Sequence, residues 1–321
     1  MAMSKVSIII PVFNHAQYLS QAIESALEQD YGNTEIIVVN DGSTDNSLAV
    51  ARSYEGKGVR VISQKNRGLS LTRNAGIAAS SGKFILPLDS DDWIDRDYLS
   101  KTVPQMSDEV GIVGTFAACF GIKDYTWHTS SPTLDQLKMD NCIPVCSLIR
   151  RSVLMEVGGY NPALSGYDKE HIGYEDWNLW IDIVKRGWKV VIVPEAIFHY
   201  REKHDSMLKR VNRPKLIAKI KSLHPDLWPS LNALPTTLTP AINPTLADPV
   251  LPNRMAPRPL RRTAPPSLPS IPEVFDAPPN WRELQQQAAS AAVNHPQVQR
   301  AVERRRRIVE AAKKKNLFGL R

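Results

Sequence analysis

Short apolar runs alternate with amphipathic stretches along the first part of the chain. Each run is rich in β-branched residues, as is typical of buried strands, and the stretches between them carry apolar residues at helical spacing. The predicted strands are 6–10, 35–40, 59–63 and 84–88, and the predicted helices between them are 16–29, 44–54 and 70–79. This alternation predicts an α/β fold with a mostly parallel central sheet flanked by helices.

The pattern becomes less regular further along. It predicts, in order, a strand at 110–120, a strand at 145–149, a helix at 151–157, a helix at 175–186 and two short strands at 189–193 and 196–200. We expect one folded domain over residues 1–224.

The C-terminal part of the chain has a different composition. Fifteen of the 24 prolines lie between Pro225 and Pro279, so residues 225–280 are expected to form an extended linker or wrapping segment. Residues 281–321 are predicted to form a basic helical segment, with helices at 281–292 and 297–315.

The net charge of +7 belongs to this C-terminal part. Residues 1–224 contain 26 Lys and Arg against 26 Asp and Glu, whereas residues 225–321 contain 14 against 7. An acidic partner is therefore expected for the tail, such as nucleic acid, an anionic membrane or an acidic protein. The alternative is a solvated helix that only maintains solubility.

Cysteine content and hydropathy exclude several protein classes. Cys119, Cys142 and Cys146 are odd in number and form no pair of CxxC motifs, which argues against a disulfide framework and a zinc site. No apolar run approaches the roughly 18 residues of a membrane span. The expectation is a cytoplasmic protein, peripheral at most on an anionic membrane surface.

An acidic cluster follows the predicted strand at 84–88. Asp89, Asp91 and Asp92 place three carboxylates within four positions, and Ser90 lies between them. Carboxylates this close together repel one another, and such repulsion is usually tolerated where a cation binds between them. Mg²⁺ or Mn²⁺ would use one or two of these carboxylates together with substrate phosphates. The alternative is an acidic turn that caps the next helix.

Other polar groups follow the first two strands. Asn14 comes after the first strand and Asp41 after the second. Ligands collect at the carboxyl ends of the strands in such sheets, so Asp41 is a candidate to accept hydrogen bonds from a base or ribose. Turn formation and helix capping explain Gly42 and Thr44 equally well.

Two cationic motifs lie around the start of the predicted helix at 70–79. Arg67 lies between Asn66 and Gly68, and Arg73 begins the sequence Arg-Asn-Ala-Gly. A helix N-terminus beside an arginine suits a diphosphate or a nucleotide, whereas a solvated loop with an ordinary surface arginine is the alternative.

The helix at 175–186 begins with Glu175 and Asp176. Acidic residues are favourable in any first helical turn, but Trp177 and Trp180 would desolvate a carboxylate and make it a candidate base. After the last strand, His199 and, as second choice, His204 are candidates to complete a metal shell.

These motifs, in this order, resemble the inverting family 2 glycosyltransferases of GT-A fold. The resemblance covers roughly residues 4–210. The matching segments are 7–14, 40–45, 66–68, 73–76, 88–93, 158–160 and 173–176.

The resemblance implies a role for each residue in transfer from a nucleoside diphosphate sugar. Asp176 looks like the catalytic base, supported by Glu175, and Asp89 and Asp91 look like the DxD acids, with Asp91 the direct metal ligand. The expected donor-binding residues are Pro11, Val12, Phe13, Asn14, Asp41, Asn66, Arg67, Gly68, Arg73, Asp89 and Ser90, and the expected metal ligands are Asp91, Asp89 and His199.

The resemblance also has limits. The chain lacks the membrane helices and the QxxRW-type motif of processive synthases, so transfer of one or a few sugars, from a UDP-sugar with Mn²⁺ or Mg²⁺, is expected. The acceptor (glycan, lipid-linked glycan, protein or nucleic acid) and the oligomeric state stay open. The competing hypothesis is a nucleic-acid-binding or scaffold protein that has kept the fold.

Overall fold

The computed structural model describes residues 3–164, 173–204 and 211–228. Its contacts divide the chain into two units, of which the first contains every element from β1 to the start of α8. The described part of the second unit is residues 221–228. The predicted linker and basic helices, apart from residues 225–228, lie outside the described residues.

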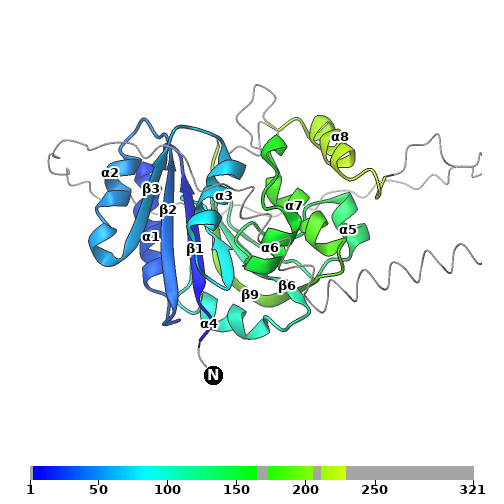
Figure 1. Ribbon diagram of the computed structural model, residues 1–321, viewed down its shortest axis with the longest axis horizontal. Helices are drawn as coiled ribbons and strands as arrows, with labels where there is room; N and C mark the ends of the chain where they lie inside the picture. The colour runs from blue at the N-terminus through cyan, green and yellow to red at the C-terminus, as the bar shows by residue number, and fades with distance from the viewer. Residues whose placement is uncertain (1–2, 165–172, 205–210, 229–321) are drawn as a thin grey trace, which may run out of the picture. The chain divides into compact units, whose positions relative to one another are not determined.

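Strands and helices alternate through the first unit (Figure 1). The strands are β1 (Val6–Val12), β2 (Thr34–Asp41), β3 (Val59–Gln64), β4 (Phe84–Pro87), β5 (Trp93–Ile94), β6 (Val110–Gly121), β7 (Tyr125–Trp127), β8 (Leu148–Arg150) and β9 (Lys189–Glu202). The α-helices are α1 (Ala16–Leu27), α2 (Ser47–Arg52), α3 (Leu69–Ala79), α4 (Tyr98–Thr102), α5 (Leu134–Met139), α6 (Arg151–Val157), α7 (Glu175–Val184) and α8 (Arg213–Leu223). The 3-10 helices in the described part of the chain are η1 (Glu55–Lys57), η2 (Val103–Gln105) and η3 (Pro162–Leu164).

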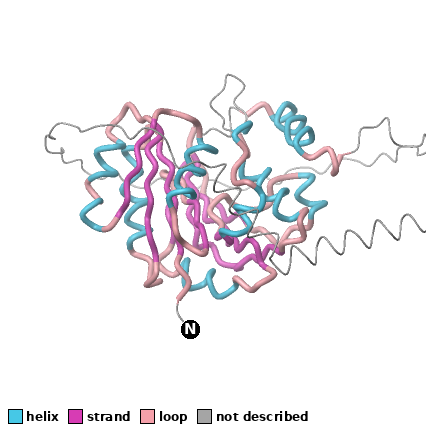
Figure 2. Tube along the Cα trace, in the orientation of Figure 1, coloured by secondary structure: helices cyan, strands magenta, loops and turns pink. Residues whose placement is uncertain are grey.

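The strands of the described residues join one nine-stranded sheet in the order β3-β2-β1-β4-β8-β6-β9-β5, with β7 paired to β6. Figure 2 shows these strands in magenta. The four neighbouring strands β3, β2, β1 and β4 are parallel to one another. Beyond them β8 runs antiparallel to both β4 and β6, whereas β6 and β9 are parallel. The carboxyl ends of β1, β2 and β4 therefore meet at one edge of the sheet.

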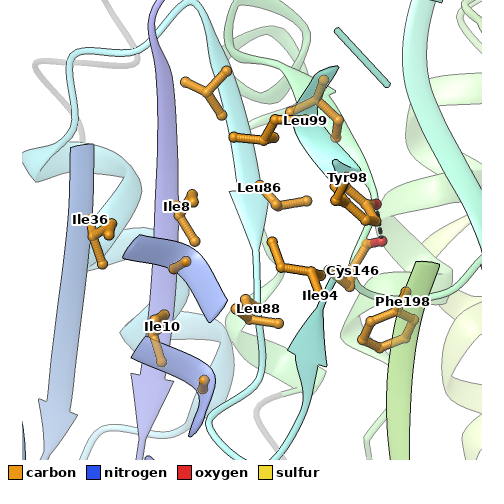
Figure 3. Packing of buried hydrophobic residues seen from close by; sticks show 14 of the residues in the cluster. Ile8, Ile10, Ile36, Leu86, Leu88, Ile94, Tyr98, Leu99, Cys146 and Phe198 are labelled. Atoms are coloured by element: carbon orange, nitrogen blue, oxygen red, sulfur yellow. Dashed lines mark hydrogen bonds between the residues drawn. The ribbon is translucent and has the colours of Figure 1, made fainter. Parts of the chain in front are cut away.

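Helices cover both faces of the parallel strands. Ile8 of β1 lies in one buried cluster with Leu19 of α1 and Leu86 of β4. The same cluster reaches Tyr98, whose hydroxyl donates a 2.7 Å hydrogen bond to the Cys146 carbonyl (Figure 3). Successive side chains of a strand point to opposite faces, so Ile9 faces away from this cluster.

The opposite face packs closely against α3. A Cβ atom at Gly76 of α3 would collide with the Ile9 side chain and lie 3.2 Å from Val39. Glycine at this position lets the helix approach β1 and β2, which fixes the start of α3 near the carboxyl ends of the strands.

The α/β fold with a flanked central sheet is confirmed, and the predicted elements up to α3 are all present. The prediction of two short strands at 189–193 and 196–200 was wrong, because β9 is continuous across Pro194. Its pairing with β6 absorbs the interruption through a register shift between Thr115 and Ala117. None of the described helices is long and apolar enough to cross a membrane.

Candidate active site

The loops after β1 and β2 are tied together by side chains. Asn14 has a φ of 55°, in the left-handed region that asparagine tolerates. The side-chain oxygen of Asn14 accepts a 2.7 Å hydrogen bond from the backbone amide of Thr44. The backbone amide of Asn14 donates a 3.0 Å hydrogen bond to the Ser43 hydroxyl. The two strand ends therefore form one rigid surface.

Asp41 holds a third loop against this surface. The side chain is buried, and its carboxylate accepts hydrogen bonds from the backbone amides of Arg67 and Gly68, both at 2.9 Å, and from the Gln64 side chain at 2.7 Å. Asp41 therefore orders residues 64–68, while the side chains of Asn66 and Arg67 are exposed.

The acidic cluster lies at the next strand end. Asp92 is 2% exposed, and burial together with the charges of Asp91 and Asp89 raises its pKa well above the usual range. One Asp92 oxygen accepts a 2.8 Å hydrogen bond from the Arg201 amide, and the other has no partner among the described residues. Asp89 and Asp91 are more exposed than Asp92 and carry the accessible carboxylates.

A buried arginine joins the acidic cluster to α7. Arg73 is 1% exposed, and its guanidinium pairs with Asp89 at 2.5 Å and with Glu175 on its other side. The same group lies 5.2 Å from the centre of the Tyr160 ring. Neighbouring Asn74 exchanges two hydrogen bonds with the Tyr160 backbone, at 2.8 and 2.9 Å. The motifs after β3 and after α6 are thus brought into contact.

Asp176 follows Glu175 and lies within the electrostatic influence of Arg73. Burial, and then the charge of Glu175, raise the pKa of Asp176 to about 7, while Arg73 and a hydrogen bond from Asn141 act in the opposite direction. Tyr174, just before the helix, has a φ of 63°. This strained backbone at the start of α7 is typical of functional sites.

Asn141 was missed by the sequence analysis. Its side-chain amide donates a 2.9 Å hydrogen bond to Asp176. The segment around it is fixed to α7 by two buried indoles, since Trp177 donates to the Leu137 carbonyl at 2.6 Å and Trp180 to the Ile143 carbonyl at 3.2 Å. This segment has no periodic pattern, so nothing in the sequence singled out Asn141.

His199 as a metal ligand stays a prediction, and the structure gives this residue other partners. Its Nε2 atom lies 2.9 Å from an Asp95 oxygen, and its ring stacks on Trp93 with centroids 3.4 Å apart. The antiparallel pairing of β5 with β9, which places His199 opposite Trp93, directs it to these partners. The runner-up, His204, is exposed.

Two other residues approach the acidic cluster instead. His15 Nδ1 lies 2.8 Å from the Ser90 hydroxyl, and Lys203 pairs with Asp91 at 2.6 Å. Burial lowers the pKa of His15, although the Asp91 carboxylate opposes this. Both follow elements that the sequence predicted, but their side chains meet only through the fold.

The donor set of this cluster fits a hard divalent cation. The described residues contain no group of three or more His, Cys, Asp or Glu side chains arranged to hold a metal. A cation here would therefore use the accessible carboxylates of Asp91 and Asp89 and complete its shell with oxygen atoms of a substrate, as Mg²⁺ commonly does.

Part of the chain is similar to a known protein family. Residues 7–158 match the family model described as Glycosyl transferase family 2. This region is therefore similar to the family 2 glycosyltransferases. The match contains the strand ends that carry Asn14, Asp41 and the acidic cluster, and it ends before α7.

Curated proteins described as glycosyltransferases are similar to part of the chain. Over 97 residues, the chain is 43% identical to glycosyltransferase GlyA of Streptococcus pneumoniae. The aligned region covers 30% of this chain and 14% of GlyA. It is also 43% identical over 110 residues to the putative glycosyltransferase EpsH of Bacillus subtilis, covering 34% of this chain and 32% of the relative. The chain thus spans less than two thirds of these relatives.

Solved structures share the fold. S. aureus TarS 1-349 in complex with UDP-GlcNAc has a TM-score of 0.58 at 18% identity, covering 68% of this chain and 65% of that one. The mannosyltransferase PcManGT from Pyrobaculum calidifontis, in complex with GDP-Man and Mn²⁺, has a TM-score of 0.53 at 16% identity, covering 70% and 64%.

Proposed function

We propose that this chain is a metal-dependent inverting glycosyltransferase that moves a sugar from a nucleoside diphosphate sugar, with UDP as the nucleotide, to an acceptor hydroxyl. One or a few sugars are added to each acceptor. The observation that carries the proposal is the Asp89–Arg73–Glu175 bridge. It joins the acidic cluster at the carboxyl ends of the strands to the start of α7, where the pKa of the neighbouring Asp176 carboxyl group is raised to about 7.

Asp176 is the proposed general base. A base works best when its pKa lies near the pH at which it operates, because it is then both ionised and basic enough to take a proton. Asp176 takes the proton of the acceptor hydroxyl while that oxygen attacks the anomeric carbon and the bond to the diphosphate breaks. A single displacement of this kind inverts the anomeric centre.

The donor side is proposed to bind the nucleotide. Residues 11–14 and the ordered loop 64–68 form the nucleoside surface, and Arg73 fixes the positions of Asp89 and Glu175. When bound at Asp91 and Asp89, a divalent cation would supply a positive charge beside the leaving diphosphate. Support for UDP comes from the TarS complex with UDP-GlcNAc, and support for Mn²⁺ from the PcManGT complex.

A panel of nucleotide sugars tests the proposal. The full chain is incubated with each UDP-sugar and with GDP-mannose, with Mn²⁺ and a mixture of candidate acceptors, and released nucleotide and glycosylated product are read by mass spectrometry. Release of UDP with transfer of one or a few sugars is expected. Absence of turnover with every donor, together with tight binding of nucleic acid, would favour a binding or scaffold protein.

Recruitment of an acidic acceptor by residues 281–321 stays a prediction, because these residues lie outside the described part of the chain. If the tail recruits the acceptor, removal of residues 231–321 leaves donor hydrolysis unchanged and weakens transfer to a large acidic acceptor. Equal transfer at physiological salt would contradict this role.

A further inference from the structure

A cation of the chain itself lies against the acidic cluster. The ammonium group of Lys203, directly after β9, is 2.6 Å from an Asp91 carboxylate oxygen and 3.0 Å from Nε2 of His15. The side chains of Lys203 and Asp91 are 17% and 15% exposed. The pair is therefore partly shielded from solvent, where an ion pair is stronger than at an open surface.

Both accessible carboxylates of the cluster thus have partners within the protein. Asp89 pairs with Arg73, and Asp91 pairs with Lys203. Each pair uses one oxygen of its carboxylate, Oδ1 of Asp89 and Oδ2 of Asp91, so a divalent cation bound at the remaining oxygens would lie close to both positive charges and be repelled by them.

The two partners differ in how readily they can leave. The Arg73 guanidinium is 1% exposed, pairs with Asp89 and Glu175 on two sides, and lies over the Tyr160 ring. Moving it would leave a buried carboxylate without a partner, which is costly. Lys203 also lies near a ring, with its ammonium 5.3 Å from the centre of Tyr18. Its side chain is flexible and 17% exposed, and the carboxylate it pairs with is less buried than Glu175, so its ammonium can move toward solvent at lower cost.

We propose that Lys203 is a built-in competitor for the divalent cation at Asp91. In the structure its ammonium neutralises Asp91, and the cation of the proposed reaction binds by taking its place. This inference rests on the metal-dependent transferase proposed above and adds a residue that sets the affinity for the metal. It predicts weak cation binding by the wild-type chain and tighter binding once the lysine charge is removed.

The test measures Mn²⁺ binding directly, without turnover. Free Mn²⁺ is titrated against the full chain by electron paramagnetic resonance, for the wild type, Lys203→Met and Lys203→Gln. We expect both variants to bind Mn²⁺ about tenfold more tightly, the lower end of the effect that a neighbouring charge has on the proton affinity of a carboxylate. Asp91→Asn should abolish binding in either background.

Lys57→Met is the matched control. Lys57 is an exposed cation in η1, before the start of β3 and so at the amino end of the parallel strands. The Lys57→Met variant removes the same charge from the molecule and should leave the affinity for Mn²⁺ unchanged. A thermal unfolding midpoint that rises with added Mn²⁺ checks that each variant is folded and binds the ion in its native state.

The outcomes separate this inference from the proposed function. If Lys203→Met binds Mn²⁺ no more tightly than wild type, or if neither binds it, the competition is wrong; sugar transfer by the wild type would still support the transferase. If binding tightens as expected but no donor is turned over, the competition at Asp91 stands and the transferase proposal fails.

Discussion

The donor side and the base side of the site are built in different ways. On the donor side, Asn14 follows β1 and Asp41 is the last residue of β2, and both are held largely by backbone amides of neighbouring loops. On the base side, Asp176 is held by Asn141 and lies beside Arg73, side chains from segments far apart in the sequence. The first arrangement follows from strand order, whereas the second depends on how the whole domain packs.

Arg73 is the residue that joins the two sides, so its removal should have the largest effect. Arg73→Met leaves Glu175 and Asp89 without their buried cation, and we expect the free energy of unfolding to fall by about 3–5 kcal/mol. Urea unfolding measures this change. Arg60→Met, which removes an exposed arginine hydrogen-bonded to the Ala79 carbonyl, is the control. A loss no greater than that of the control would show that the two sides are independent.

Asp176→Asn separates chemistry from donor binding. The transfer rate should fall by roughly a hundredfold or more, as expected for loss of a general base, while affinity for UDP is unchanged. Asp182→Asn is a control on the same helix, where the carboxylate pairs with Lys185 and Arg186. Normal transfer by Asp176→Asn would mean that another group acts as the base.

The pH dependence tests the environment of Asp176. Its pKa is raised to about 7, so the ionised base is lost as the pH falls through 7. Below that value we expect the transfer rate to fall by about tenfold per pH unit, measured under conditions of saturating donor. A profile flat down to pH 5 would contradict the assignment.

The same raised pKa has a consequence for stability. Because the folded protein holds the Asp176 proton more tightly than the unfolded chain does, this group favours folding at low pH, and that contribution is lost as the pH rises toward 7. Asp176→Asn should therefore be more stable than wild type at pH 8, and this difference should shrink in acid. Thermal unfolding at both pH values measures it.

Asn141→Ala should have the smallest effect, and it tests how Asn141 influences the pKa of Asp176. The hydrogen bond from Asn141 lowers the pKa of Asp176, so its loss should move the acid limb of the pH profile upward and reduce transfer at pH 7 by a few fold. Gln105→Ala, which removes an exposed amide in η2, is the control. An unchanged acid limb would leave Asn141 with only a structural role.

Prediction from sequence succeeded where local pattern determines structure. The strands from β1 to β4 and the helices between them follow from hydrophobic periodicity, and parallel pairing then places Asn14, Asp41 and Asp89 at one edge. The role of metal ligand for His199 stays a prediction, and its contacts with Trp93 and Asp95, which strand pairing creates, were not predicted. The pairing joins β5 to β9, about a hundred residues further along the chain, and no local signal in the sequence specifies such a pairing.

The sequence by itself determined the alternation of strands and helices, the acidic cluster after β4 and the carboxylates that begin α7, because each depends on residues close together in the chain. Only the tertiary structure decided that Arg73 links Asp89 to Glu175, that Asn141 contacts Asp176 and that Lys203 pairs with Asp91. These contacts join residues far apart in sequence, and burial, which gives them their strength and raises the pKa of Asp176, exists only once the sheet and its helices have packed.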